Sequence, residues 1–87
     1  MEEISATVGS AQGLHARPAA TFVRAVAASG VPVTLVAGDR TVDAASLLAV
    51  LTLGVSHGDT VTLRTADAAD LPRLESLADL LASELDR

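Results

Sequence analysis

The chain opens with a stretch in which apolar and polar residues alternate. Over residues 3–8 the apolar side chains fall on every second position. Successive side chains of a strand point to opposite faces, so this pattern predicts a strand with one buried and one wet face. Similar alternation over residues 31–36, 41–43 and 60–65 predicts three more strands.

Three other segments place their apolar residues at helical spacing. The first covers residues 16–28 and is expected to end at Gly30, which suits a left-handed helix cap. The second, over residues 47–53, follows Ser46 as its N-cap. A final helix is expected to begin after Asp70, its predicted cap. Its apolar stripe consists of Leu71, Leu74, Leu77, Leu81 and Leu85.

The elements therefore follow the order βαββαβα. Strands that alternate indicate an antiparallel sheet with one wet face, because a parallel sheet buried on both faces would show continuous apolar runs. The three helices must then cover the other face. With 87 residues the chain has room for one core, so residues 1–87 are predicted to form a single α+β domain.

Composition and charge exclude several classes of function. A net charge of −5 and a single aromatic residue argue against nucleic acid as a partner. The chain has no cysteine, and its two histidines lie far apart, so neither a metal site nor a cofactor is expected. No apolar run is long enough for membrane insertion, and an acidic start is unlike a signal peptide. A cytoplasmic location is the expectation.

The strongest chemical signal lies where the first helix is about to begin. His15 occupies the cap position that Ser, Thr, Asp or Asn usually holds, with Arg17 and Pro18 in the following turn. The first N–H groups of a helix, here those of Ala16 and Arg17, have no helical partner and bind phosphate readily. The pattern predicts that His15 accepts a phosphoryl group. Arg17 would stabilise its oxygens through charge-assisted hydrogen bonds.

The second predicted helix is unusually apolar. Thr52 is its only polar residue, although a helix on an open sheet buries only about half of its circumference. Part of its apolar surface is therefore expected to face solvent and to form a docking patch. The alternative is a helix that lies wholly in the core. The candidates for the docking patch are Leu47, Leu48 and Leu51.

Three further residues carry weaker signals. Arg24 follows Arg17 along the first helix, so it is either a positive rim of the docking patch or a lone surface arginine. Ser46 precedes the second predicted helix, and its role as an N-cap is enough to explain a serine there. His57 has no carboxylate or serine at triad-like spacing and is expected to be a solvated loop residue.

Two blocks of the sequence resemble the HPr family, the phosphocarrier proteins of the bacterial phosphoenolpyruvate:sugar phosphotransferase system. Residues 13–19, Gly-Leu-His-Ala-Arg-Pro-Ala, resemble its active-site signature. Residues 43–54 resemble a second block that surrounds a serine and ends in Leu-Gly. The resemblance covers the whole chain and implies an open-faced β-sandwich, with a four-stranded antiparallel sheet and three helices on one face.

The resemblance also implies how the protein works. His15 would receive a phosphoryl group on Nδ1 from phospho-enzyme I and pass it to sugar-specific IIA proteins or domains. The chain would be a monomeric, stoichiometric carrier, not an enzyme. Ser46 corresponds to a serine that a kinase phosphorylates in some members, which adds a serine kinase or a transcription regulator as candidate partners. Unlike many relatives this chain has no lysine, so its partner contacts are expected to be mainly apolar.

Two other functions compete with the sugar-system carrier. One is a specialised regulatory module of the same family, in a nitrogen-type or dihydroxyacetone-kinase system, whose phosphorylation state is sensed. The other is a small ligand-binding or dimerising α/β module in which His15 is incidental.

Overall fold

The computed structural model describes residues 2–11 and 13–83. Its elements follow the predicted order, with one additional 3-10 turn (η1) before the last helix. They are β1 (Glu2–Thr7), α1 (Ala16–Ser29), β2 (Thr34–Ala37), β3 (Arg40–Asp43), α2 (Leu47–Thr52), β4 (Thr60–Thr65), η1 (Ala68–Asp70) and α3 (Leu71–Ala82).

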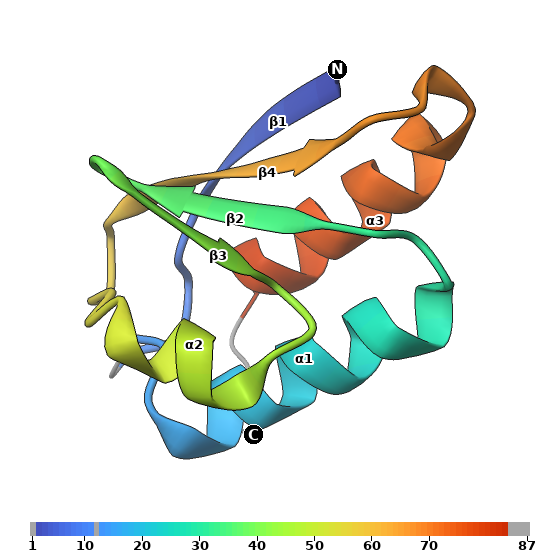
Figure 1. The fold of residues 1–87 in the computed structure, drawn as a ribbon. Coiled ribbons are helices and arrows are strands. Elements are labelled where there is room, and N and C mark those ends of the chain that lie inside the picture. Colours follow the sequence, from blue (N-terminus) through green and yellow to red (C-terminus); the bar gives the residue numbers. More distant parts are fainter. Residues whose placement is uncertain (1, 12, 84–87) are drawn as a thin grey trace.

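The four strands form one antiparallel sheet in the order β1-β4-β2-β3. Its two central strands are β4 and β2, and β1 and β3 form the edges. Figure 1 shows α1, α2 and α3 on the same side of this sheet, with the other side uncovered. The predicted α+β fold, an open-faced sandwich, is confirmed.

The alternation in the sequence matches the two faces of the sheet. In β4, Val61 and Leu63 are buried beneath the helices, whereas Thr62 points to the open face. Thr62 lies opposite Ser5 of β1 and Val36 of β2 in the register of the sheet. The open face is therefore largely hydroxylated, and the core lies entirely on the helical side.

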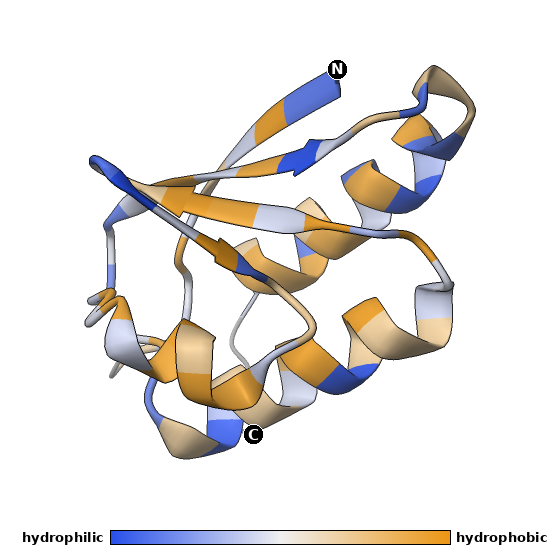
Figure 2. Cartoon of the chain, viewed as in Figure 1, coloured by the Kyte–Doolittle hydropathy of each residue, from blue (hydrophilic) through white to orange (hydrophobic). Residues whose placement is uncertain are grey.

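Side chains from both layers fill the core. The largest that are fully buried include Phe22 and Val26 of α1 and Leu35 and Leu63 of the central strands. The predicted leucine stripe of α3 is largely confirmed: Leu74, Leu77 and Leu81 are buried, Leu71 is partly buried, and Leu85 lies outside the described residues. Figure 2 shows hydrophobic residues recurring along the ribbons of α1 and α3.

One predicted boundary and one predicted capping bond are wrong, although α3 begins at Leu71, directly after Asp70, as expected. Strand β2 begins at Thr34 and not at residue 31, because Pro32 lacks the N–H group that a ladder needs. Asp70 makes no capping hydrogen bond and has helical backbone angles, φ −88 and ψ 0. The side chain of Asp67 instead accepts a hydrogen bond from the Ala69 N–H and caps the preceding 3-10 turn.

Candidate functional site

His15 lies at the N-cap of α1, as predicted. Its backbone is extended, with φ −83 and ψ −171, and its carbonyl accepts the first helical hydrogen bond from Ala19 at 2.9 Å. The imidazole is exposed and makes no capping hydrogen bond to the first turn. The ring therefore lies at the helix N-terminus but does not cap the helix.

The first turn of α1 is suited to binding an anion. Ala16 and Arg17 are the first two helical residues, so their N–H groups have no acceptor within the helix. Pro18, at the third helical position, has no N–H and is buried. The turn contains no acidic residue. Two N–H groups and the positive end of the helix dipole thus lie directly after His15.

Four arginines differ in whether they form an ion pair. Arg64 and Arg73 pair with carboxylates at 2.6 and 3.7 Å. In the part of the chain that the structure describes, Arg17 and Arg24 form no ion pair, and both side chains are exposed. They lie two turns apart on α1 and so share one side of the helix. These two charges are therefore available to an anionic ligand or partner.

This positive region lies within an acidic protein. The sequence has no acidic residue between Glu3 and Asp39, or between Asp43 and Asp59. Helices α1 and α2 lie wholly within these two intervals. The net charge of −5 therefore arises elsewhere, and no carboxylate of either helix opposes a phosphoryl group at His15.

The loop before His15 is held closely against the segment that follows α2. The N–H of Leu14 donates to the Val55 carbonyl at 3.0 Å, and the Leu14 side chain is buried. Gly13 has a φ of +73, and a Cβ atom there would lie 2.4 Å from the Val55 oxygen. Only glycine permits both this conformation and this approach.

We expect Gly13→Ala to lower the free energy of unfolding by about 2–4 kcal/mol, through left-handed strain and overpacking together. The matched control is Gly30→Ala, since Gly30 has a similar φ of +71 but nothing within 4 Å of the added Cβ. The control should lose only about 1–2 kcal/mol. Urea denaturation measures both variants, and equal losses would show that the close approach to Val55 costs nothing.

Helix α2 exposes part of its apolar surface. The exposed fraction is 75% for Leu48 and 38% for Leu47, whereas Leu51 is partly buried and Val50 fully buried. Figure 2 shows α2 as a mostly hydrophobic ribbon. The expectation that some of these leucines face solvent is confirmed, and Leu48 dominates the exposed surface. Helices α1 and α2 pack against each other, so the leucines border the helix that carries His15.

Ser46 acts as the N-cap of α2, as the sequence predicts. Its hydroxyl oxygen accepts a hydrogen bond from the Ala49 N–H at 3.3 Å. At the other end of α2, Arg40 donates to the Thr52 carbonyl at 2.6 Å. A cation at a helix C-terminus is favourable. Arg40 was not predicted from the sequence, since only the fold brings the start of β3 to this helix end.

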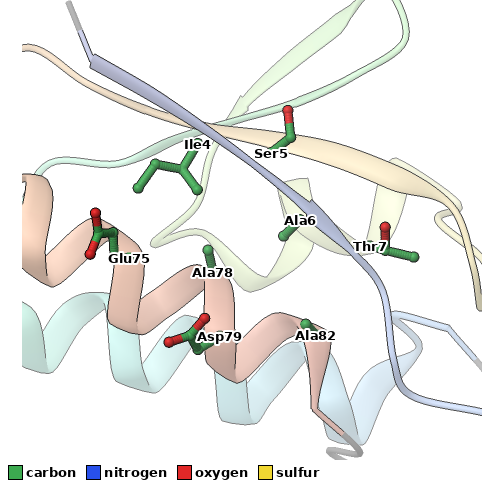
Figure 3. Close-up of a pocket in the computed structure, with 8 residues that line it drawn as sticks. All are labelled: Ile4, Ser5, Ala6, Thr7, Glu75, Ala78, Asp79 and Ala82. Atoms are coloured by element: carbon green, nitrogen blue, oxygen red, sulfur yellow. The ribbon is translucent and has the colours of Figure 1, made fainter.

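The structure also contains a groove of about 400 Å³ that includes none of the predicted site residues. It lies between the edge strand β1 and α3, and Figure 3 shows Glu75 and Asp79 at its helical wall. Two carboxylates disfavour a phosphoryl group, so the groove is not an alternative site for this chemistry. Its other lining residues are Ile4, Ser5, Ala6, Thr7, Ala78 and Ala82.

The described residues contain neither a cluster of metal-binding side chains nor a membrane-spanning helix. Among residues 2–11 and 13–83, no three His, Cys, Asp or Glu side chains are grouped so that they could hold a metal ion. In the same part of the chain, no helix has the length and apolar character needed to cross a bilayer.

Comparison with known proteins identifies the family. Residues 2–83 match the family model for the PTS HPr component phosphorylation site. The chain is 48% identical to the phosphocarrier protein HPr of Streptomyces coelicolor over 99% of this chain and 94% of that protein. It is 33% identical to the multiphosphoryl transfer protein of Xanthomonas campestris, over 95% of this chain but only 10% of that protein.

A solved structure agrees with these relatives. The crystal structure of HPr-C-His from Thermoanaerobacter tengcongensis superimposes with a TM-score of 0.88 at 30% identity, covering 100% of this chain and 98% of that one. These matches favour a phosphoryl carrier over the specialised regulatory module and over a module with an incidental histidine. The chain belongs to the HPr family, the phosphocarrier proteins of the phosphotransferase system.

Proposed function

We propose that His15 is the phosphoryl acceptor of this carrier, and that it takes the group from enzyme I and delivers it to IIA proteins or domains. The observation that carries the proposal is the exposed imidazole at the start of α1, which makes no capping bond and directly precedes two helical N–H groups. Arg17, without an ion pair among the described residues, supplies the compensating charge.

The chemistry asks little of the protein beyond alignment. The lone pair of His15 Nδ1 attacks phosphorus, and the bond from phosphorus to the donor group breaks as the new N–P bond forms. Negative charge on the three phosphoryl oxygens faces the Ala16 and Arg17 N–H groups and the Arg17 guanidinium. Transfer to the acceptor reverses these steps. The chain therefore acts once per phosphoryl group, as a stoichiometric carrier and not as an enzyme.

A relay experiment tests this proposal. Enzyme I, a IIA protein and labelled phosphoenolpyruvate are incubated with and without this chain. We expect the label to reach the IIA protein only when the chain is present. Label that stays on enzyme I, although a known HPr passes it on under the same conditions, would contradict the proposal.

We propose that the partners dock on the surface formed by Leu47, Leu48, Leu51 and Arg24. Leu48 offers the most exposed apolar area, and Arg24 adds a positive edge that no described carboxylate neutralises. Because α1 and α2 contain no acidic residue, the surface suits a partner with apolar and acidic side chains. The patch must stay open to successive partners, which supports a monomer of one domain. A cytoplasmic location, expected from the resemblance to a bacterial phosphocarrier, is part of the same proposal.

Leu48→Glu should weaken binding to enzyme I by about 10- to 100-fold, because a leucine that the partner would bury is replaced by a charge that loses its water on binding. The melting temperature should barely change, since the side chain is 75% exposed. The matched control is Thr41→Glu, which adds the same charge at an exposed position of β3. Calorimetric titration measures affinity, and equal weakening by both variants would contradict the assigned docking surface.

Ser46 remains a candidate for phosphorylation on the strength of the resemblance alone. Its hydroxyl is engaged in the cap of α2, which accounts for its presence. A phosphate there would add negative charge beside Leu47 and Leu48, where it would oppose an acidic partner. A serine kinase or a transcription regulator would then be an additional partner.

A further inference from the structure

The loop before the phosphorylation site depends on a segment from the other half of the chain. Leu14 donates to the Val55 carbonyl at 3.0 Å. At the start of the loop, Val8 donates to the Asp59 carbonyl and accepts from the Gly58 N–H, both at 2.9 Å. The segment over residues 55–59 therefore spans the loop from end to end, and Figure 1 shows the two passing close together beside α2.

His57 lies in the middle of this segment and contacts the loop through its ring. Its Nδ1 atom is 3.1 Å from the carbonyl oxygen of Ser10. A carbonyl oxygen only accepts, so Nδ1 carries the proton and donates. The same oxygen accepts a second hydrogen bond, from the Gly13 N–H at 2.9 Å. His57 and Gly13 thus share the carbonyl at the start of the turn that leads to His15.

The carbonyl that accepts the bond from His57 belongs to a buried residue. Ser10 is fully buried. If the bond from His57 is lost, the oxygen keeps the Gly13 N–H but loses a donor that water does not replace at a buried position, so the turn is held less firmly. The hydrogen bond between Ser10 and Gly13 closes this turn, and His15 lies two residues beyond Gly13. A shift there would move the imidazole relative to the N-terminus of α1.

The backbone of His57 is itself fixed by a closed turn. The Ser56 N–H donates to Oδ2 of Asp59 at 2.9 Å, and the Asp59 N–H donates back to the Ser56 carbonyl at 3.0 Å. Gly58, with a φ of +85, allows the chain to reverse within this turn. The two hydrogen bonds between Ser56 and Asp59 therefore fix the backbone on both sides of His57. The His57 ring contacts Ser10, although the residue as a whole is exposed.

We propose that His57 is a positioning residue for phosphoryl transfer. Its Nδ1–H holds the Ser10 carbonyl and thereby keeps the turn closed by Ser10 and Gly13, and His15 beyond it, in the geometry that meets the phosphoryl group. His57 does not touch the phosphoryl group itself. The proposal rests on the proposed role of His15. His57 is an exposed loop residue, as expected, and its bond to Ser10 is an additional contact that the sequence did not predict.

A pair of variants of similar size separates the hydrogen bond from the bulk of the ring. His57→Asn keeps a side-chain N–H near the position of Nδ1, whereas His57→Leu removes the donor. For His57→Leu we expect the rate constant of transfer from enzyme I to fall about 3- to 10-fold, with KM within about 2-fold of the wild type. His57→Asn should restore the rate constant to within about 2-fold of the wild type.

Hydrogen exchange of the Gly13 amide gives a readout that needs no phosphoryl transfer. It should be faster in His57→Leu than in the wild type, and restored in His57→Asn. Equal rates for the two variants, or a defect confined to KM, would overturn the role of His57 while leaving His15 as the acceptor. A wild-type chain that takes up no phosphoryl group at all would refute the proposed function, and this inference with it.

Discussion

Replacing His15 by alanine is expected to abolish phosphoryl transfer while the fold remains intact. The variant lacks the proposed phosphoryl acceptor, so the amount of label transferred from phosphoenolpyruvate to a IIA protein should fall to the level measured without this chain. The imidazole is exposed and caps nothing, so the free energy of unfolding should change by less than about 0.5 kcal/mol. Label transfer and thermal unfolding by circular dichroism measure the two effects.

The second histidine provides the control for this prediction. His57→Ala removes an imidazole of the same kind but should still accept one phosphoryl group, though more slowly. Phosphoryl uptake by His15→Ala would show that the acceptor lies elsewhere. An unfolded His15→Ala protein would show instead that the ring is structural.

Arg17→Ala is expected to slow phosphoryl transfer by about 100-fold, because one charge-assisted contact to the transferring group is lost. Affinity for enzyme I should stay within about 3-fold, since docking is assigned mainly to the leucines of α2. The guanidinium makes no ion pair among the described residues, so no partner is left uncompensated. Quench-flow measurements over a range of enzyme I concentrations separate the rate constant from KM.

Arg24→Ala is the matched control, because Arg24 is also exposed and lies two turns further along α1. It should affect the affinity and its salt dependence more than the transfer step. If Arg17→Ala lowers affinity and rate to the same extent as Arg24→Ala, both arginines serve docking alone.

Much of the fold follows from local patterns in the sequence. Alternation predicts the strands because one face of the sheet is buried and the other, with Thr62, is open. Ser46 and Gly30 predict the ends of helices because capping depends only on neighbouring residues. The exposure of Leu48 follows from a helix too apolar for the area that it buries.

The features that the sequence did not reveal depend on contacts between distant segments. Arg40 reaches Thr52 only because β3 and α2 are neighbours in the fold. The bond from His57 to Ser10 joins residues on either side of α1, β2, β3 and α2. No sequence pattern connects residues so far apart, so the contact of His57 with Ser10 could not be predicted before the fold was known.

The acceptor role of His15 is tested most directly by the intact mass of the protein after incubation with phosphoenolpyruvate and enzyme I. The enzyme I should be one that phosphorylates the Streptomyces coelicolor relative, which serves as the positive control. We expect a gain of one phosphoryl group, labile in acid and located on His15 by peptide mapping. An unchanged mass beside a phosphorylated control, or a phosphoryl group on any other residue, would contradict it.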